Sequence, residues 1–343
     1  MLKRIFDTAT FLVIAIVVVI GTTPAHAQKV SLIRDSEIEN TIRQFAAPVF
    51  KAADVDPSAV RIHLVQDNTL NAFVAGGQRL FINTGLITQA NSASQIIGVI
   101  AHETGHIAGG HLAKFNEVLG NSTAITILSI ILGATAIAAG RGDVGAVVIG
   151  AGQGIAQREF LRYSRTQESA ADQAALKYLD NTGQSAKGLL DFMNLLGEQE
   201  LLLPEYQDAY VRTHPLSRDR VSAIAFHVAN STHSNKPVSP ELEMLYRRAR
   251  AKLIGYLYPI GQTLRYYKTR DNSLVSRYAR AIGYYRAADL DKARPLIDSL
   301  LAEYPRDPYF WELKGQMIFE NGDAKGALVP YQKAVSLLPH SAL

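Results

Sequence analysis

Five consecutive residues, His102-Glu103-Thr104-Gly105-His106, constrain this chain more than any other feature. Residues four apart on a helix project from one face, so two imidazoles with this spacing can hold one metal ion. The Glu that follows the first His would stand beside a water on that metal, where a general base is needed. Apolar residues between positions 96 and 100, with Ser94 as a cap, predict that the helix is buried. The alternative is a core helix with two hydrogen-bonded histidines.

A third ligand is available further along the chain. A catalytic zinc site takes three protein ligands and leaves a fourth position for water. Glu168 and Asp172 form a pair one helical turn apart, 62 residues after His106. Glu168 would be the third ligand, and Asp172 would be an acceptor that orients a ligating imidazole. Such a pair on an Ala-rich helix usually faces solvent, but the upstream motif favours the metal-site interpretation.

A competing scheme uses a third His, six residues after the second. Leu112 occupies that position. His111 lies nine residues after His102, which is about half a turn off the ligand face of a continuous helix. The scheme therefore fails, and Glu168 remains the predicted third ligand.

Further motifs accompany these residues. Asn71-Ala72-Phe73 precedes a Gly76-Gly77 turn, and Thr213-His214-Pro215 is followed by Arg220. As a set, over roughly residues 60 to 225, they resemble the HtpX/CaaX-protease-type zinc metallopeptidases. Within this family the chain resembles the periplasmic, β-barrel assembly-enhancing branch, which carries a tetratricopeptide tail.

The resemblance implies one zinc ion per chain, held by His102, His106 and Glu168, with Glu103 as the catalytic base. It also implies that His214 and Arg220 lie near the metal. There they would stabilise the oxyanion, or His214 would occupy the open coordination position in a resting state.

The residues alone would not reveal these last two roles. Judged only by its neighbours, His214 is a turn residue before Pro215, and Arg220 is a surface cation.

Short alternating segments predict a small sheet on which substrate could lie. Residues 60–66, 71–75 and 80–87 have strand patterns around the glycine turn. An edge strand here could pair with an extended peptide through main-chain hydrogen bonds, with little side-chain selectivity. We assign Asn71, Ala72 and Phe73 to substrate binding, and His63 to a structural role on an exposed strand face.

The segment between the two ligand pairs is almost free of charge. Residues 118–140 contain no charged side chain, and after Arg141 and Asp143 the chain stays uncharged to Gln157. A single membrane crossing is excluded because His106 and Glu168 must meet at one metal. We expect a hydrophobic helical hairpin over 118–157 that covers the site or contacts a membrane surface. A buried core hairpin is the alternative.

After about residue 235 the amino-acid composition of the chain changes. Tyr, Arg, Leu and Ala recur at helical spacing, and a 34-residue period matches the tetratricopeptide length. The second copy places Trp311, Gly315 and Tyr331 on signature positions. A third copy upstream is not convincing because Pro259 would interrupt its second helix.

The first residues indicate export. Lys3 and Arg4 precede an uncharged run over residues 8–20, and Ala25-His26-Ala27 is typical of a cleavage site. The run is short for a membrane span, which needs about 20 residues, so a cleaved signal peptide over 1–27 is favoured over an uncleaved anchor. The chain has no cysteine, which excludes disulfides and thiolate metal sites. A net charge of +4 without an arginine-rich stripe gives no case for nucleic acid.

The sequence thus predicts an α+β protein. A mostly helical, gluzincin-like zinc metallopeptidase domain with a small β-sheet would occupy residues 28–235, and an all-α tetratricopeptide-repeat module would occupy 236–343. By resemblance, the expected location is the periplasm, where the protein could also contact a membrane surface. The implied task is degradation of unfolded or misassembled outer-membrane proteins, and assistance to their assembly machinery through the repeats. The alternative is a chaperone or scaffold with latent or minor proteolysis, although an intact ligand set favours an enzyme.

Overall fold

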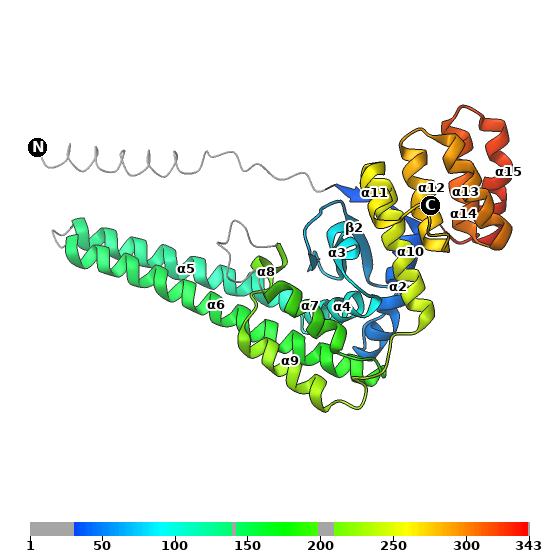
Figure 1. Cartoon of the computed structure of the whole chain (residues 1–343). Helices are drawn as coiled ribbons and strands as arrows, with labels where there is room; N and C mark the ends of the chain where they lie inside the picture. The colour runs from blue at the N-terminus through cyan, green and yellow to red at the C-terminus, as the bar shows by residue number, and fades with distance from the viewer. Residues whose placement is uncertain (1–30, 139–141, 198–208, 342–343) are drawn as a thin grey trace, which may run out of the picture. The chain divides into compact units, whose positions relative to one another are not determined.

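The computed structural model describes residues 31–138, 142–197 and 209–341. The predicted signal peptide lies outside these ranges. From Leu32 onwards the chain forms one compact unit, in which many helices surround one small sheet (Figure 1). The predicted α+β class with a small sheet is therefore confirmed for the described residues.

The sheet has four strands within the described part of the chain, in the order β1-β2-β4-β3. β2 and β4 are parallel, whereas β3 and β4 form a hairpin that turns at Gly76 and Gly77. Both glycines have positive φ, +58° and +91°, which favours residues without a Cβ. β3 is left at the edge of the sheet. The strands are β1 (Leu32–Ile33), β2 (Arg61–Val65), β3 (Ala72–Ala75) and β4 (Arg79–Asn83).

The predicted strand over residues 80–87 is only half right. β4 ends at Asn83, and α3 (Thr84–Gln89) follows at once. The turn at Asp67 holds this helix in place, because Thr84 Oγ1 and the Gly85 amide both donate to the Asp67 carbonyl, at 2.9 and 2.7 Å. Local hydrogen bonding therefore overrides the strand propensity of the segment.

One helix, α4 (Ala93–Ala108), runs through the main core and packs against α2 (Ser36–Ala52), α6 (Gly142–Asn181) and α7 (Lys187–Gly197). Gly105 lets α4 approach α6 closely, because a Cβ there would lie 2.7 Å from the Ala171 carbonyl oxygen. The glycine inside the His-Glu-Thr-Gly-His motif thus brings the two predicted ligand helices together.

The predicted hairpin is formed by α5 (His111–Ala138) and the first half of α6, which lie side by side and extend away from the sheet (Figure 1). Their seam is tight: a Cβ on Gly133 would lie 2.6 Å from the Gly145 carbonyl oxygen. Large apolar side chains on the hairpin are exposed, so the buried-core alternative is wrong. Among the described residues, no helix combines the length and the apolar character that a membrane crossing requires.

The remaining helices follow in order. They are α8 (Ala209–Thr213), α9 (Arg218–Asn230), α10 (Pro240–Leu257), α11 (Ile260–Tyr266), α12 (Leu274–Arg286), α13 (Leu290–Glu303), α14 (Pro308–Glu320) and α15 (Ala324–Leu337). The pairs α12–α13 and α14–α15 pack against each other, and residues from α12, α13 and α14 build a core of their own.

Buried ion pairs join this tail to α2. Glu37 at the start of α2 lies 2.7 Å from the Arg248 guanidinium and accepts a hydrogen bond of 2.7 Å from the Tyr278 hydroxyl. Lys252 lies 2.8 Å from Asp35 and 3.3 Å from Glu37. Burial raises the pKa of Glu37, but Arg248 and Lys252 outweigh burial and hold that pKa below its usual value. The tail is therefore fixed to α2, the first helix of the described residues.

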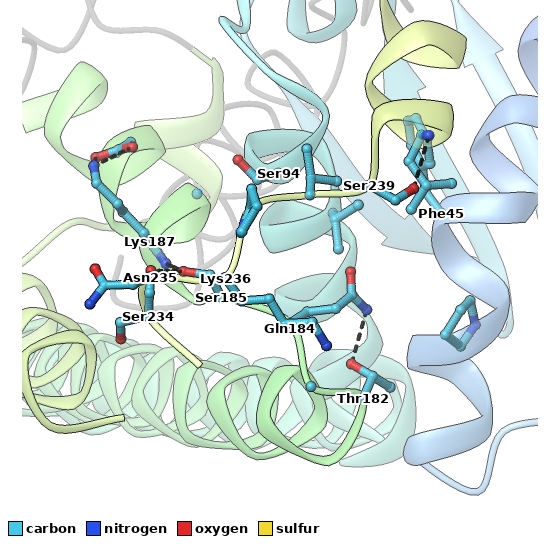
Figure 2. Close-up of a pocket in the computed structure, with 18 of the residues that line it drawn as sticks. Phe45, Ser94, Thr182, Gln184, Ser185, Lys187, Ser234, Asn235, Lys236 and Ser239 are labelled. Atoms are coloured by element: carbon cyan, nitrogen blue, oxygen red, sulfur yellow. Dashed lines mark hydrogen bonds and ion pairs between the residues drawn. The ribbon is translucent and has the colours of Figure 1, made fainter. Parts of the chain in front are cut away.

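A cavity of about 550 Å³ lies between α2, the start of α4, and the segments 182–188 and 234–239 (Figure 2). Phe45 and Ile97 contribute to its apolar part, and Lys187 and Lys236 are among its polar residues. None of the predicted site residues lines it.

Candidate metal centre

α4 presents the motif from a buried position. His102 and Glu103 are 0% and 1% exposed, so neither side chain faces bulk solvent. The helix begins two residues earlier than its predicted cap requires. Ser92 is the N-cap residue, and Ser94 lies in the first turn with its hydroxyl 2.8 Å from that of Ser92. The predicted cap was therefore wrong, but the predicted helix is present.

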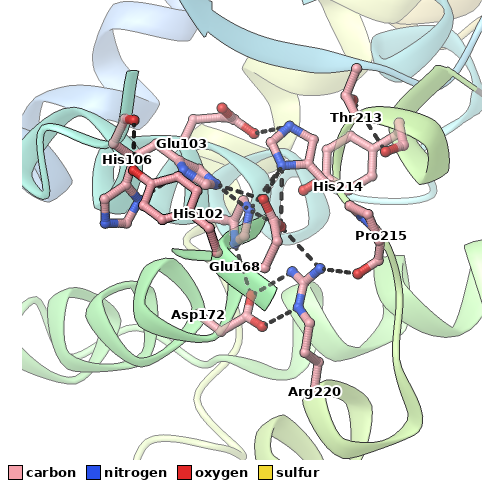
Figure 3. Close-up of polar contacts among 12 residues, drawn as sticks. His102, Glu103, His106, Glu168, Asp172, Thr213, His214, Pro215 and Arg220 are labelled. Carbon is pink, nitrogen blue, oxygen red and sulfur yellow. Dashed lines mark hydrogen bonds and ion pairs between the residues drawn. The ribbon is translucent and has the colours of Figure 1, made fainter. Parts of the chain in front are cut away.

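The two imidazoles of the motif converge on one point with a carboxylate from α6 (Figure 3). His102 Nε2 lies 3.1 Å from His106 Nε2. Glu168 Oε2 lies 3.3 Å from His102 Nε2, and Glu168 Oε1 lies 3.3 Å from His106 Nε2. Together with one nitrogen of His214, these ligand atoms all lie within 4.8 Å of one another.

The outer nitrogen of His102 is held by a carboxylate. His102 Nδ1 lies 2.8 Å from Asp172 Oδ1. Burial lowers the pKa of His102, but hydrogen bonds to Asp172 and Glu168 outweigh burial and raise the pKa to about 10. The two carboxylates thus favour a positive charge at this ring, whether a proton or a metal ion supplies it.

The second imidazole has a different partner. His106 Nδ1 lies 2.9 Å from His111 Nδ1, with the two rings edge to face at a centroid distance of 5.0 Å. Burial lowers the pKa of His106 to about 3, so its ring is neutral at ordinary pH. A neutral ring has a lone pair to offer a metal.

Glu103 lies beside this cluster, but the cluster does not supply hydrogen bonds to its carboxylate. Neither carboxylate oxygen has a hydrogen-bond partner among the described residues. The nearest cationic candidate is His214, whose Nε2 lies 3.4 Å from Glu103 Oε1. Burial raises the pKa of Glu103. A buried carboxylate without partners indicates a group that interacts with substrate, water or metal.

His214 reaches the cluster from the end of α8. Its backbone amide donates to the Tyr210 carbonyl at 2.7 Å, and its ring stacks on the Tyr210 ring at 4.5 Å. His214 Nδ1 lies 3.0 Å from Glu168 Oε1 and 3.4 Å from His102 Nε2. The ring therefore stands among the predicted ligands and not behind them.

Arg220 lies in the first turn of α9, where Ser217 caps the helix. Its guanidinium donates to both Asp172 oxygens, at 2.6 and 2.9 Å, and to the Pro215 carbonyl at 2.8 Å. It also lies 3.0 Å from Glu168 Oε2. Burial lowers the pKa of Arg220, but Asp172 outweighs burial and raises it. Arg220 is thus a buried cation that binds two carboxylates of the site.

The donor set fits a divalent metal ion. Two imidazole nitrogens face each other at hydrogen-bond distance while their outer nitrogens are bound to Asp172 and His111. Two lone pairs in that position repel unless a proton or a cation lies between them. Two imidazoles and one carboxylate are also a known ligand set of catalytic zinc sites.

The structure brings seven of the predicted residues together: His102, Glu103, His106, Glu168, Asp172, His214 and Arg220. For the other three, no described hydrogen bond, ion pair or ring contact reaches this group, although β3 packs against α4. Asn71 precedes β3, and Ala72 and Phe73 lie on it. Phe73 stacks on Phe81, which in turn stacks on His63.

Two residues of the site were missed from sequence. Tyr210 is fully buried against His214, and His111 contacts His106. The signal for His111 was its place five residues after His106, but only if the helix is assumed to break. Tyr210 carried no signal beyond its proximity to His214 in sequence.

An apolar pocket of about 460 Å³ adjoins the cluster. Its wall includes His106 and Ile107 at the end of α4, Leu112 at the start of α5, and Val74 on the edge strand β3. The pocket therefore connects the predicted substrate strand to a predicted metal ligand.

Comparison with known proteins gives consistent matches. The model of peptidase family M48 matches residues 33–227, which is more than half of the chain. Two relatives are a beta-barrel assembly-enhancing protease of Yersinia pestis, 25% identical over 80% of this chain, and a putative one of Vibrio cholerae, 27% identical over 72%. A mitochondrial metalloendopeptidase, OMA1, of Schizosaccharomyces pombe is 26% identical over 48%. This chain spans 56%, 51% and 45% of their respective lengths.

Proposed function

The chain belongs to peptidase family M48, and from this membership we propose that it is a zinc-dependent endopeptidase. The observation that carries the proposal is the convergence of His102, His106 and Glu168 beside a buried carboxylate, Glu103, that has no hydrogen-bond partner in the described structure. We propose zinc because two His at i and i+4 on one helix, with a Glu base between them and a carboxylate as third ligand, form the pattern of catalytic zinc sites in metallopeptidases.

Zinc held by His102, His106 and Glu168 would supply an acidified water and a Lewis acid for the scissile carbonyl. Glu103 would take the proton from the attacking water and deliver it to the leaving amine. Burial raises the pKa of Glu103 above its ordinary value, a shift in the direction that favours proton transfer near neutral pH. Asp172 holds the His102 ring through Nδ1 and so keeps Nε2 directed at the metal.

His214 has two possible roles, and its position supports one of them. A ligand that fills the open coordination position displaces the water that Glu103 must activate, so the resting enzyme would be latent. Its Nδ1 belongs to the same cluster of ligand atoms as Glu168. We therefore favour the latent state, with release of His214 before turnover.

Arg220 was predicted to stabilise the oxyanion. Its donors are directed at Asp172, Glu168 and Pro215. These contacts support a different role, in which Arg220 fixes the carboxylates of the site and neutralises their charge.

Substrate would lie along β3. This strand is at the edge of the sheet, so the side away from β4 can pair with an extended peptide. Asn71, Ala72 and Phe73 would then supply the register. The apolar pocket beside His106 would receive one substrate side chain, which adds selectivity that main-chain pairing lacks.

The α5–α6 hairpin is proposed to contact a lipid surface. Five large side chains of α5 are each 44–57% exposed: Ile127, Leu128, Ile130, Ile131 and Leu132. At 100° per residue these positions spread over roughly 200° of the helix circumference, and Ser129 and Gly133 on the remaining side face α6. A helix that packs on protein has an apolar stripe about 100° wide, whereas a helix that is apolar over its whole free surface is suited to a core or to lipid.

Vesicle flotation tests this contact. We expect the full chain to float with vesicles of phosphatidylethanolamine and phosphatidylglycerol, and Ile127→Ser/Ile131→Ser to stay in solution. Leu195→Ser, which changes an exposed apolar residue of α7, is the matched control. A wild-type protein that does not float, or a double variant that floats equally well, contradicts the proposal.

The cellular role is proposed from the relatives' names, which describe proteases that enhance β-barrel assembly. By this likeness, the chain acts in the periplasm on unfolded or misassembled outer-membrane proteins. The helical pairs α12–α13 and α14–α15 would be tetratricopeptide repeats that contact the assembly machinery.

Metal content and peptide cleavage test the enzymatic proposal. Glu103→Gln should keep zinc and lose cleavage of an unfolded outer-membrane protein, since Glu103 is a base and not a ligand. Glu168→Ala should lose zinc. If Glu103→Gln cleaves normally, the base is elsewhere. If it cleaves nothing yet fully supports client assembly, the chain acts as a scaffold.

A further inference from the structure

His111 lies where a continuous helix would not put it. α4 ends at Ala108, and Gly110 adopts a positive φ of +61° before α5 begins at His111. This break turns the chain, so that the His111 ring is directed back at His106. The ring is 8% exposed and therefore belongs to the interior.

The contact is with the nitrogen of His106 that faces away from the metal centre. His106 Nε2 points at His102 and Glu168, while His106 Nδ1 lies 2.9 Å from His111 Nδ1. A ligand that gives its Nε2 lone pair to a metal carries its proton on Nδ1. His111 Nδ1 must then accept that hydrogen bond, which fixes both the tautomer and the tilt of the His106 ring.

Glycine at position 109 makes this arrangement possible. A Cβ at Gly109 would lie 2.2 Å from His111 Nε2, so the imidazole packs directly on the glycine backbone. Gly109 itself has φ −73° and ψ −11°, which any residue can adopt. The glycine is therefore required by the His111 ring and not by the backbone. The hydroxyl of Tyr163 on α6 donates to the backbone carbonyl of His111 at 3.4 Å.

We infer that His111 is a positioning residue of the metal centre, which orients His106 as Asp172 orients His102. This inference rests on the proposed zinc site. The two motif imidazoles are thus held by chemically different partners, a carboxylate for one and an imidazole for the other. Groups of this kind tune a ligand without touching the metal.

Zinc affinity, measured by competition with a chromophoric chelator on the full chain, tests the inference. His111→Phe keeps the ring volume and removes the acceptor, so zinc should bind about 10- to 100-fold more weakly. His111→Gln restores an acceptor oxygen and should recover part of the loss. Lys114→Met is the matched control, because it removes an exposed hydrogen bond to the Gly109 carbonyl in the same turn. It should bind zinc normally.

Gly109→Ala probes the same contact without changing His111. The new methyl group must displace the His111 ring, so zinc affinity should fall in this variant as well. In the double variant Gly109→Ala/His111→Gln, the loss of zinc affinity should be smaller than the sum of the two single losses, because both substitutions act on one hydrogen bond. Thermal unfolding of the metal-free proteins separates a specific loss of zinc affinity from a general loss of stability. If the effect is specific, the melting temperatures of the metal-free variants should change little.

The results distinguish the two levels of the proposal. A wild-type protein without zinc affinity would overturn the proposed function itself. Normal wild-type binding together with unchanged affinity in His111→Phe and Gly109→Ala would overturn the role of His111 alone. Equal losses in metal-free stability and in zinc affinity would show that His111 only supports the fold.

Discussion

Replacement of Arg220 by methionine separates a positioning cation from an oxyanion donor. Methionine has a similar length and no charge. The change removes the hydrogen bonds to Asp172 and Pro215 and the ion pair to Glu168. Asp172 and Glu168 are each 4% exposed, so solvent cannot replace the lost cation.

The expected cost follows from this burial. Removing one partner of a buried ion pair costs about 3 to 5 kcal/mol because a charge stays behind uncompensated. His102 remains beside both carboxylates and supplies part of the compensation. We therefore expect a loss near the lower limit, about 3 kcal/mol, in the unfolding free energy of the metal-free protein.

Denaturant unfolding with a chelator present measures this loss. Arg218→Met is the matched control, because Arg218 lies two residues earlier on α9 and is exposed. Its unfolding free energy should change by less than about 0.5 kcal/mol. An Arg220→Met protein with normal stability and zinc affinity, but with a kcat reduced about 10²- to 10³-fold, would refute our account and favour the oxyanion role.

Three further perturbations have defined outcomes. Glu37→Gln should lower the free energy of unfolding by about 2 to 3 kcal/mol at neutral pH. The pKa of Glu37 in the folded protein lies below its unfolded value near 4.5. The loss of unfolding free energy relative to wild type, measured in unfolding curves at a series of pH values, should therefore be constant above pH 4.5 and shrink below it. His214→Ala should raise basal proteolysis and self-cleavage with Glu103 still required, whereas a variant that binds zinc but is slower on every peptide would favour oxyanion stabilisation. Gly133→Val should separate α5 from α6 and lower the melting temperature, while Gly150→Ala, which has open space around it, should not; equal melting temperatures would mean that the seam contributes nothing.

The helix that carries His102 and His106 could be predicted because the pattern that defines it lies within a few neighbouring residues. Spacing places His102 and His106 on one face whatever surrounds the helix, and the flanking apolar residues predict its burial. Glu168 was predictable for a related reason, since the chemistry of zinc demands a third ligand and few residues at helical spacing could supply it.

The parts that failed depend on where helices begin, end and join. The strand predicted over residues 80–87 becomes helical after Asn83 because the Asp67 turn binds Thr84 and Gly85. His111 was excluded as a metal ligand, and the converging ligand atoms indeed belong to other residues. Its contact with His106 was not predicted, because that contact depends on the break at Gly110. Glycine allows such a break but does not require it, so the sequence could not decide.

Most other long-range contacts could not be read from the residue pattern alone. Without the family resemblance Arg220 looks like a surface cation, whereas in the structure it is buried on α9 and donates to Asp172 of α6. The hairpin and the helix of Glu168 were expected as separate segments, whereas α6 runs through both. The ion pair between Glu37 and Arg248 joins residues more than 200 positions apart, and the spacing of residues in the sequence does not predict such a contact.

X-ray absorption at the zinc edge of the zinc-loaded protein tests the central claim most directly. We expect imidazole nitrogens at about 2.0 to 2.1 Å with the outer-shell scattering of two rings, or of three if His214 is bound, together with a carboxylate oxygen. Glu168→Gln should weaken binding, and His214→Ala should reduce a three-ring signal to two. A zinc shell of water and carboxylate oxygens without imidazole scattering would contradict the proposed metal centre.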